Sequence, residues 1–226
     1  MVRKLKALLA PKFWRVPRKQ QKWVVSPSPG PHKKFECIPL SILIRNVLGL
    51  AETLKESKKI IKAGNIKVDG KIRKDYRYPV GLFDTIEIEK IEKFYRIVPF
   101  KNGLKPIEIS KDEVNKKICK VINKTAIKGS KIQFNLHDGK NIIFENRVKT
   151  NDVFLLELPK LKVLDVIKFE KGNLAMVIKG KLAGNIYKIK EITNSHVILN
   201  VEGRDQYVDK KGIFVVGREK PVLKLC

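Results

Sequence analysis

The first 35 residues of the chain contain ten lysine or arginine residues and no aspartate or glutamate. A segment of this composition repels itself and has no acidic side chain of its own to pair with, so it favours an anionic partner. Pro11 and Pro17 interrupt any helix in it, and residues 26–31 hold three prolines in six positions, which excludes both a helix and a central strand. We therefore expect residues 1–36 to form a basic N-terminal arm that ends in an extended connector.

Three large aromatic rings, Phe13, Trp14 and Trp23, interrupt the charges of this arm. Lysine and arginine bind phosphates, and aromatic faces stack on unpaired bases or fill pockets in folded RNA. The alternative is that the rings dock the arm against the protein's own body, and the sequence leaves both interpretations open. The candidate RNA contacts in the arm are Arg3, Lys4, Lys6, Lys12, Trp14, Arg15, Arg18, Lys19, Lys22, His32, Lys33 and Lys34.

The whole chain has the same bias, with 49 lysine and arginine residues against 23 aspartate and glutamate residues and a net charge of +26. Nucleic acid is the leading candidate partner for this surplus, and an anionic membrane surface is the second. No apolar run approaches the ~18 residues that span a bilayer, and the apolar stretch at residues 7–10 is too short for a signal peptide. The three cysteines are far apart and odd in number, which argues against a disulfide-stapled secreted domain.

Two helices are predicted after the connector. Apolar residues at positions 40, 43, 44, 47 and 48 recur at helical spacing and predict a helix that ends near Gly49. Thr53 and Glu56 have the spacing of a capping box, which predicts the start of a second helix, and Gly64 is placed to end it. The lysines of this second helix gather on its polar side and form a ridge next to the helix N-terminus, where phosphate binds well.

A β-hairpin is predicted directly after the second helix. Residues 66–68 and 71–73 flank Asp69-Gly70, which is a strong hairpin turn, and Lys67, Lys71 and Arg73 are expected on the polar face. A further strand is predicted at residues 85–88.

The sequence at residues 62–71, Lys-Ala-Gly-Asn-Ile-Lys-Val-Asp-Gly-Lys, resembles the small αα-β RNA-binding module named after ribosomal protein S-four. The resemblance implies that the second helix and the hairpin hold structured RNA. The candidate RNA contacts of this S-four-like module are Arg45, Lys55, Lys58, Lys59, Lys62, Lys67, Lys71 and Arg73.

The middle of the chain is predicted to be mostly β-structure. Short strands with turn signals recur near residues 94–98, 107–109, 119–122, 131–136, 141–144, 152–157 and 163–169, which favours a compact barrel or sandwich. Ser110 and Glu113 have capping-box spacing and predict a short helix to about Lys117. His137-Asp138-Gly139 is expected to form a hairpin turn.

The last part of the chain reads as a strand, a basic turn that contains glycine, and a second strand, over residues 172–189. This pattern resembles the KOW motif, the small SH3-like β-barrel of ribosomal proteins and transcription elongation factors. The candidate RNA contacts of this part are Lys179, Lys181, Gly184 and Lys188.

The order of these parts is similar to that of the archaeal and eukaryotic small-subunit ribosomal family called S-four-E, or S4e. Residues 10–14 (Ala-Pro-Lys-Phe-Trp), 30–33 (Gly-Pro-His-Lys), 36–40 (Glu-Cys-Ile-Pro-Leu), 45–46, 117–121 and 213–217 carry the resemblance. It implies a structural constituent of the small ribosomal subunit that binds and stabilises folded rRNA next to other small-subunit proteins, in the cytoplasm. Because the chain ends soon after Pro221 without the basic tail of eukaryotic members, we expect an archaeal type.

The predicted fold class is therefore multidomain α+β. The expected parts are the basic extension at 1–36, the S-four-like module at 37–93, a central β-rich domain at 94–170 and a KOW/SH3-like barrel at 171–226.

An enzyme is not expected. The three histidines, His32, His137 and His196, lie in no metal-ligand spacing, and the sequence contains no phosphate loop or nucleophile elbow. We expect no cofactor, no metal, no small-molecule substrate and no membrane partner. The alternative function is a non-ribosomal RNA-binding factor, or a factor associated with RNA modification.

Overall fold

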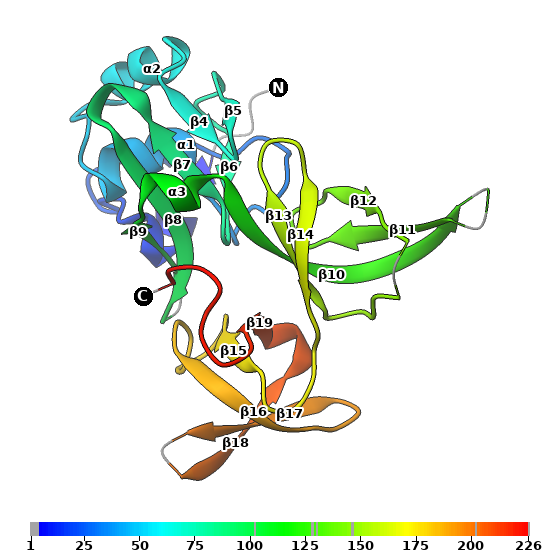
Figure 1. Cartoon of the computed structure of the whole chain (residues 1–226). Coiled ribbons are helices and arrows are strands. Elements are labelled where there is room, and N and C mark those ends of the chain that lie inside the picture. The colour runs from blue at the N-terminus through cyan, green and yellow to red at the C-terminus, as the bar shows by residue number, and fades with distance from the viewer. Residues whose placement is uncertain are drawn as a thin grey trace. The chain divides into compact units, whose positions relative to one another are not determined.

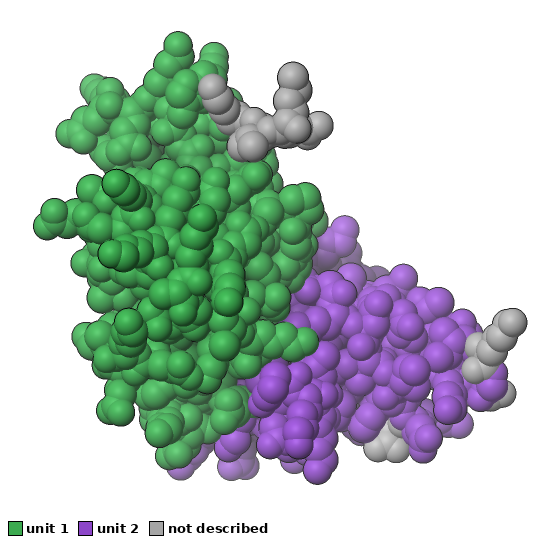
Figure 2. Space-filling view, turned by 90° about the horizontal axis from the view of Figure 1, so that it is seen from above, with its two compact units in different colours: residues 1–98, 103–115 green, residues 99–102, 116–226 purple. Residues whose placement is uncertain are grey.

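The computed structural model describes residues 5–101, 103–127, 129, 131–145, 147–201 and 203–225. They form two compact units, which Figure 2 colours green and purple. Unit 1 holds residues 1–98 and 103–115, and unit 2 holds residues 99–102 and 116–226. The described part is mostly β-sheet with few helices (Figure 1).

Unit 1 is built on a five-stranded sheet in the order β5-β4-β7-β8-β9. These strands are β5 (Lys71–Ile72), β4 (Ile66–Val68), β7 (Thr85–Ile88), β8 (Lys93–Phe100) and β9 (Gly103–Glu108). Two small antiparallel ribbons accompany the sheet: β1 (Leu5–Lys6) with β2 (Trp23–Val24), and β3 (Ile38–Pro39) with β6 (Pro79–Val80). The helical elements are η1 (Ala7–Leu9), η2 (Lys12–Trp14), α1 (Leu40–Ile42), η3 (Leu43–Val47), α2 (Leu54–Lys62), η4 (Glu89–Ile91) and α3 (Lys111–Val114).

The first predicted helix is confirmed, but most of it is wound more widely than an α-helix. Only α1 is α-helical, and η3 continues it as a π-helix, in which the Leu48 N–H donates to the Leu43 carbonyl at 2.9 Å. Gly49 has φ +67° and ends the helix, a conformation that glycine adopts without steric cost. The apolar face is buried, because Leu40, Leu43 and Ile44 are fully inaccessible to solvent.

The second helix and the hairpin follow the sequence prediction closely. Thr53 caps α2, its Oγ1 accepting from the Glu56 N–H at 3.2 Å while the Glu56 carboxylate accepts from the Thr53 N–H at 3.4 Å. Gly64 has φ +80° after the last turn, and Asp69 and Gly70, with φ +53° and +70°, form the turn between β4 and β5. Each of these signals depends on residues a few positions away, which is why the sequence predicts these elements correctly.

The predicted basic arm is not a free arm in the structure. Leu5, Ala7, Ala10, Trp14 and Val24 are buried in the same hydrophobic core as the helices and β3. The predicted connector is also docked, since the Ser28 N–H donates to the Arg77 carbonyl at 2.9 Å and the Arg77 Nε donates to the Ser26 carbonyl at 2.9 Å. The N-terminal segment, residues 5–36, is therefore part of unit 1. Burial of its apolar side chains stabilises the docked state more than repulsion among its positive charges destabilises it.

The start of the predicted central domain differs from the expectation, because β8 pairs with β7 and extends the sheet of unit 1. The helix predicted from Ser110 to about Lys117 ends at Val114, and β10 begins two residues later at Lys116. The predicted capping box is wrong, since the Ser110 side chain makes no capping hydrogen bond. The Glu113 carboxylate instead accepts from Arg96 at 2.8 Å, where it partners a guanidinium that is fully buried.

Unit 2 contains two five-stranded antiparallel sheets. The first has the order β12-β11-β10-β13-β14, with β12 (Asn141–Ile143), β11 (Lys131–Leu136), β10 (Lys116–Ile127), β13 (Val153–Glu157) and β14 (Lys162–Ile167). The second has the order β18-β17-β16-β15-β19, with β18 (Arg204–Asp209), β17 (His196–Val201), β16 (Ile186–Ile192), β15 (Leu174–Val177) and β19 (Ile213–Gly217). A short 3-10 turn, η5 (Lys210–Gly212), precedes β19.

Strand β10 belongs to both halves of the first sheet. Its residues 116–120 pair with β13 (Figure 1). Val121 and residues 123–127 pair with β11, with an irregularity in the register between Val121 and Asn123. Phe134 and Phe154 pack edge to face in the core under this sheet, with ring centroids 5.6 Å apart. The strands predicted in this region are confirmed, and β10 is longer than expected because the bulge bends the strand without ending it.

Candidate nucleic-acid interface

The lysines of α2 form the ridge that the sequence predicts. Lys55, Lys59 and Lys62 are exposed, and positions 55, 58, 59 and 62 lie on one side of a helix. Lys58 is half-buried, with its ammonium 4.3 Å from the centroid of the Tyr76 ring. We call these four residues the lysine ridge.

The N-terminus of α2 is already occupied by the chain itself. The Glu56 carboxylate accepts from the Glu52 and Thr53 backbone N–H groups, and these hydrogen bonds hold the pKa of Glu56 below its ordinary value. Phosphate is thus expected along the lysine ridge rather than at the helix terminus, because the terminal donors already have an anionic partner.

The hairpin presents its basic residues on two faces, which corrects the prediction of a single polar face. Lys67 pairs directly with Ile72, and Lys71 pairs with Val68, and directly paired residues of antiparallel strands point to the same side. Lys67 therefore points away from the side of Lys71. Its ammonium lies 3.8 Å from Glu87 and also pairs with Glu89, and the Glu89 bond is the main reason that its pKa is raised.

Lys71 and Arg73 remain on the other side of the hairpin. Lys71 is exposed, and the Arg73 guanidinium lies over the Tyr78 ring with its central carbon 4.4 Å from the ring centroid. A guanidinium stacked in this way loses rotational freedom, which lowers the entropy lost when it binds a phosphate. The ring contacts of Tyr76 and Tyr78 have no signal in the sequence, because both tyrosines lie in an irregular loop.

Trp14 does not face solvent, which corrects its assignment as an RNA contact. It is fully buried, and its Nε1 donates to the Cys37 carbonyl at 2.7 Å. The interpretation in which the ring docks the segment against the protein's own body is the right one for Trp14. It does not hold equally for the other rings, since Phe13 is half-buried and Trp23 is 42% exposed.

The basic residues of the N-terminal segment divide into exposed and engaged groups. Arg18 is half-buried and donates to the Ala10 carbonyl. Outside this segment, Arg45 on η3 donates to Asn46 Oδ1 at 2.8 Å, and burial lowers its pKa. Arg3 and Lys4 lie outside the described residues. The exposed candidates are Lys6, Lys12, Arg15, Lys19, Lys22, Lys33 and Lys34.

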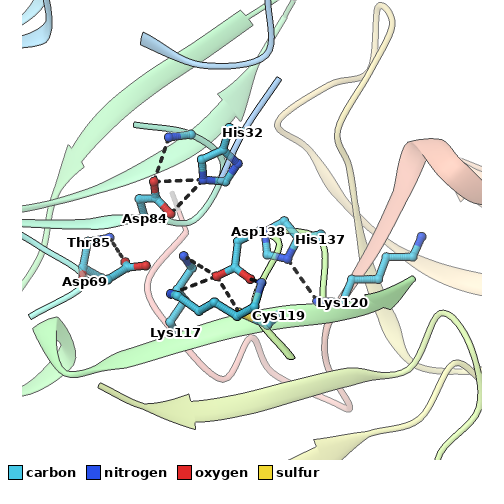
Figure 3. Close-up of polar contacts among 11 residues, drawn as sticks. His32, Asp69, Asp84, Thr85, Lys117, Cys119, Lys120, His137 and Asp138 are labelled. Atoms are coloured by element: carbon cyan, nitrogen blue, oxygen red, sulfur yellow. Dashed lines mark hydrogen bonds and ion pairs between the residues drawn. The ribbon is translucent and has the colours of Figure 1, made fainter. Parts of the chain in front are cut away.

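His32 is also placed inside the fold rather than at the surface. Its Nε2 lies 3.0 Å from both carboxylate oxygens of Asp84, and the two side chains are 6% and 2% exposed (Figure 3). The Gly81 N–H donates to the same carboxylate at 2.8 Å. A Cβ on Gly81 would lie 2.2 Å from the imidazole ring, so glycine is required there for the ring to pack. The assignment of His32 as an RNA contact is therefore replaced by a structural role.

The basic turn of the last sheet keeps its lysines at the surface. Lys179, Lys181 and Lys188 are exposed. Gly184 has φ +96°, and a Cβ there would lie 2.8 Å from the Pro99 carbonyl oxygen. Close packing against the chain thus accounts for Gly184, whereas the prediction had made it an RNA contact.

Among the described residues, one group has the composition of a metal site: Cys119, His137 and Asp138, whose ligand atoms lie within 4.8 Å of one another. The Asp138 carboxylate is instead paired with the Lys117 ammonium at 3.0 Å (Figure 3). It also pairs with the Lys140 ammonium at 3.0 Å. His137 Nδ1 accepts from the Lys120 N–H at 3.3 Å. Two ammonium groups repel a cation from this position, so the donor set fits a buried ion-pair network and does not fit a metal.

The same network contains two strongly perturbed groups. Burial opposes ionisation of Asp138, but Lys117, His137 and Lys140 outweigh it and lower the pKa of this carboxyl. Lys120 donates from Nζ to the carbonyls of Lys210 and Ile213, each at 2.8 Å, and burial lowers its pKa to about 8.

In the part of the chain that the structure describes, no helix has the length and apolar character needed to cross a bilayer.

Three family models match the chain. Residues 1–35 match the RS4NT domain, residues 39–86 match the S4 domain, and residues 91–163 match Ribosomal family S4e. Together these matches cover most of the chain in the order that the sequence resemblance implies.

Relatives of nearly the same length carry one name. The small ribosomal subunit protein eS4 of Archaeoglobus fulgidus is 47% identical over 97% of this chain and 97% of its own length. Those of Ignicoccus hospitalis and Methanocella arvoryzae are 40% and 41% identical over 99% and 97% of this chain, and 94% and 96% of their own lengths. The crystal structure of the 30S ribosomal protein S4e from Thermoplasma acidophilum superposes with a TM-score of 0.71 at 29% identity, over 80% of this chain and 95% of that chain.

Proposed function

The chain belongs to ribosomal family S4e, a constituent of the small ribosomal subunit, and we propose that it binds and stabilises folded ribosomal RNA through the lysine ridge. The observation that carries this proposal is the spacing of exposed Lys55, Lys59 and Lys62 along one side of a capped helix. Lys71 and the Tyr78-stacked Arg73 of the hairpin add to the same module. An RNA-binding S4 domain match over residues 39–86 supports this placement.

The mechanism is replacement of counterions along the RNA backbone. Each lysine that meets a phosphate releases condensed cations, so affinity falls as salt is added. Phosphate contacts fix register, and a rigid protein surface recognises the shape of folded RNA rather than its linear sequence. Exposed lysines of the ridge contribute little to the stability of the fold. Their ammonium groups can therefore bind phosphates without loss of contacts that hold the fold together.

The remaining basic surfaces extend this interface. The exposed lysines and arginines of the N-terminal segment act from a docked position, not as a flexible leader. We propose residues 171–226 as a KOW-like module, which is supported by the antiparallel five-stranded sheet and the basic turn with exposed Lys179 and Lys181. We also infer that neighbouring small-subunit proteins contact the chain, and that its role is structural rather than catalytic.

The test is RNA binding of the triple variant K55A/K59A/K62A, with small-subunit rRNA as the probe. Each lost phosphate contact reduces the magnitude of the slope of log affinity against log salt by about 0.7 to 0.9, so the triple variant is expected to lose about 2 to 3 units of slope. The matched control is K90A/K93A/K111A, which removes the same charge from exposed positions elsewhere in unit 1. Equal affinity and slope for the wild type and the ridge variant would contradict the assignment.

A further inference from the structure

We propose that Trp23 is a stacking platform for an unpaired RNA base, an inference that rests on the proposed function and assigns one of its contacts. The chain has two tryptophans, and the structure treats them in opposite ways. Trp14 is fully buried, whereas Trp23 is 42% exposed. An indole ring at the surface of a folded unit offers an aromatic face on which an unpaired base can stack.

The backbone holds Trp23 in a fixed position. It lies on β2, where Trp23 pairs with Lys6 and Val24 pairs with Leu5 of β1. Leu5 and Val24 are 4% and 9% exposed and belong to the core of unit 1. Since successive side chains of a strand point to opposite sides, the buried pair anchors the ribbon while Lys6 and Trp23 face outward together. The ring is thus presented by a scaffold that is already ordered before RNA arrives.

The residues around the Trp23 ring favour a negatively charged ligand that also has a planar ring. Lys6 is exposed on the same side of the ribbon, and the Lys22 ammonium lies 5.8 Å from the centroid of the Trp23 ring. Residues 1–35 contain no acidic side chain. An exposed ring with one lysine before it in the chain and another paired with it across the ribbon matches a nucleotide, whose base stacks on the ring while its phosphates meet the ammonium groups.

The base must be unpaired to reach this ring. Paired bases in an RNA helix are covered on both faces by their neighbours, and the deep major groove does not admit a side chain of this size. A looped-out or single-stranded base offers a free face. The local charge makes an apolar protein partner a poor match, because such a partner would have to bury Lys6 and Lys22 without a counter-charge.

Tryptophan fluorescence provides the first test. The full chain is titrated with single-stranded oligoadenylate, and an abasic strand of the same length serves as the control that has phosphates but no bases. We expect oligoadenylate to quench the fluorescence of the wild type and of a W14F variant, and to leave a W23F variant unquenched. Equal quenching by the abasic strand, or unchanged quenching in W23F, would overturn the proposal.

Affinity provides the second test. Stacking of one base contributes about 1–3 kcal/mol, so W23A is expected to bind oligoadenylate about 5- to 150-fold more weakly with an unchanged salt slope. W23F retains a ring and is expected to lose much less. The matched control is L9A, which truncates an exposed apolar side chain of the same segment that has no ring. Equal affinities for W23A and L9A overturn the stacking role alone, whereas a wild type that binds neither strand nor rRNA overturns the proposed function.

Discussion

The Nε1 of Trp14 donates a 2.7 Å hydrogen bond to the backbone carbonyl of Cys37, and this bond joins the N-terminal segment to the start of the helical module. Both residues are fully buried. The contact explains how a segment with ten positive charges and no negative charge in its first 35 residues is nevertheless held as part of a folded unit. Its charge then lies on an ordered surface, which lowers the entropy lost when RNA binds.

Substitution of Trp14 is expected to destabilise unit 1. W14A leaves a large cavity and is predicted to cost about 3–5 kcal/mol, while W14F loses the hydrogen bond and is predicted to cost about 1–3 kcal/mol. Urea unfolding followed by circular dichroism measures both. W23F is the control, with an expected change within about 0.5 kcal/mol because its ring is exposed. A W14A variant as stable as W23F would show that the segment is not docked.

Gly81 and His32 are expected to be coupled. A methyl group at position 81 would overlap the His32 ring, so G81A is predicted to unfold at lower temperature than the wild type. H32A removes the ring and its bonds to Asp84 and is destabilising as well. The double variant H32A/G81A should be more stable than the sum of the two single effects predicts, by about 0.5–3 kcal/mol. Simple additivity of the three melting measurements would refute the packing described.

Gly184 and Gly180 form a matched pair of glycines. Both have a positive φ, +96° and +93°, but a Cβ at 184 meets the Pro99 carbonyl oxygen at 2.8 Å, whereas a Cβ at 180 meets nothing within 4 Å. Alanine at either position is expected to cost about 1–2 kcal/mol in backbone strain, and G184A an additional 1–3 kcal/mol, roughly, from the overlap. Thermal unfolding of the two variants should therefore separate them, and equal melting temperatures would argue against the close approach at 184.

Lys120 predicts a pH dependence of stability with a definite sign. Burial lowers its pKa to about 8 from 10.5, so between these values the unfolded chain binds more protons than the folded chain. The contribution of Lys120 to the free energy of unfolding therefore rises as the pH increases from about 8 to 10.5. This contribution is measured as the difference in the free energy of unfolding between the wild type and K120M at each pH. The difference is needed because burial raises the pKa of the Cys37 thiol to about 12, so Cys37 lowers the stability of both proteins as the pH rises above 9. A pH-independent difference would contradict the lowered pKa.

Local signals predicted the parts of the fold that need no distant partner. The capping box of Thr53 and Glu56, the helix end at Gly64 and the turn at Asp69-Gly70 all depend on neighbours a few residues away, and all are present. Short strand-like runs separated by turn signals likewise predicted most strands of unit 2. The lysine ridge followed from helical spacing alone, which is why the exposed face of α2 was predictable.

Distant partners account for what the sequence did not predict. Glu113 has the spacing of a capping residue, but buried Arg96 takes its carboxylate because an unpaired buried guanidinium is far more costly than an uncapped helix. Trp14 and His32 lie among basic residues in the sequence, just as an exposed RNA contact would. Only the three-dimensional positions of their partners, Cys37 for Trp14 and Asp84 for His32, show that both side chains are buried. The bulge that lets β10 run past Ile122 depends on pairing with β11 and β13.

Sedimentation of the chain with ribosomal particles tests the central claim most directly. A cell lysate is fractionated on sucrose gradients at low and high salt, and the chain is detected across the fractions. We predict that it lies in the small-subunit peak at low salt and that rising salt releases the K55A/K59A/K62A variant before the wild type. Recovery of the wild-type chain at the top of the gradient at low salt, with none in the small-subunit peak, would contradict the account.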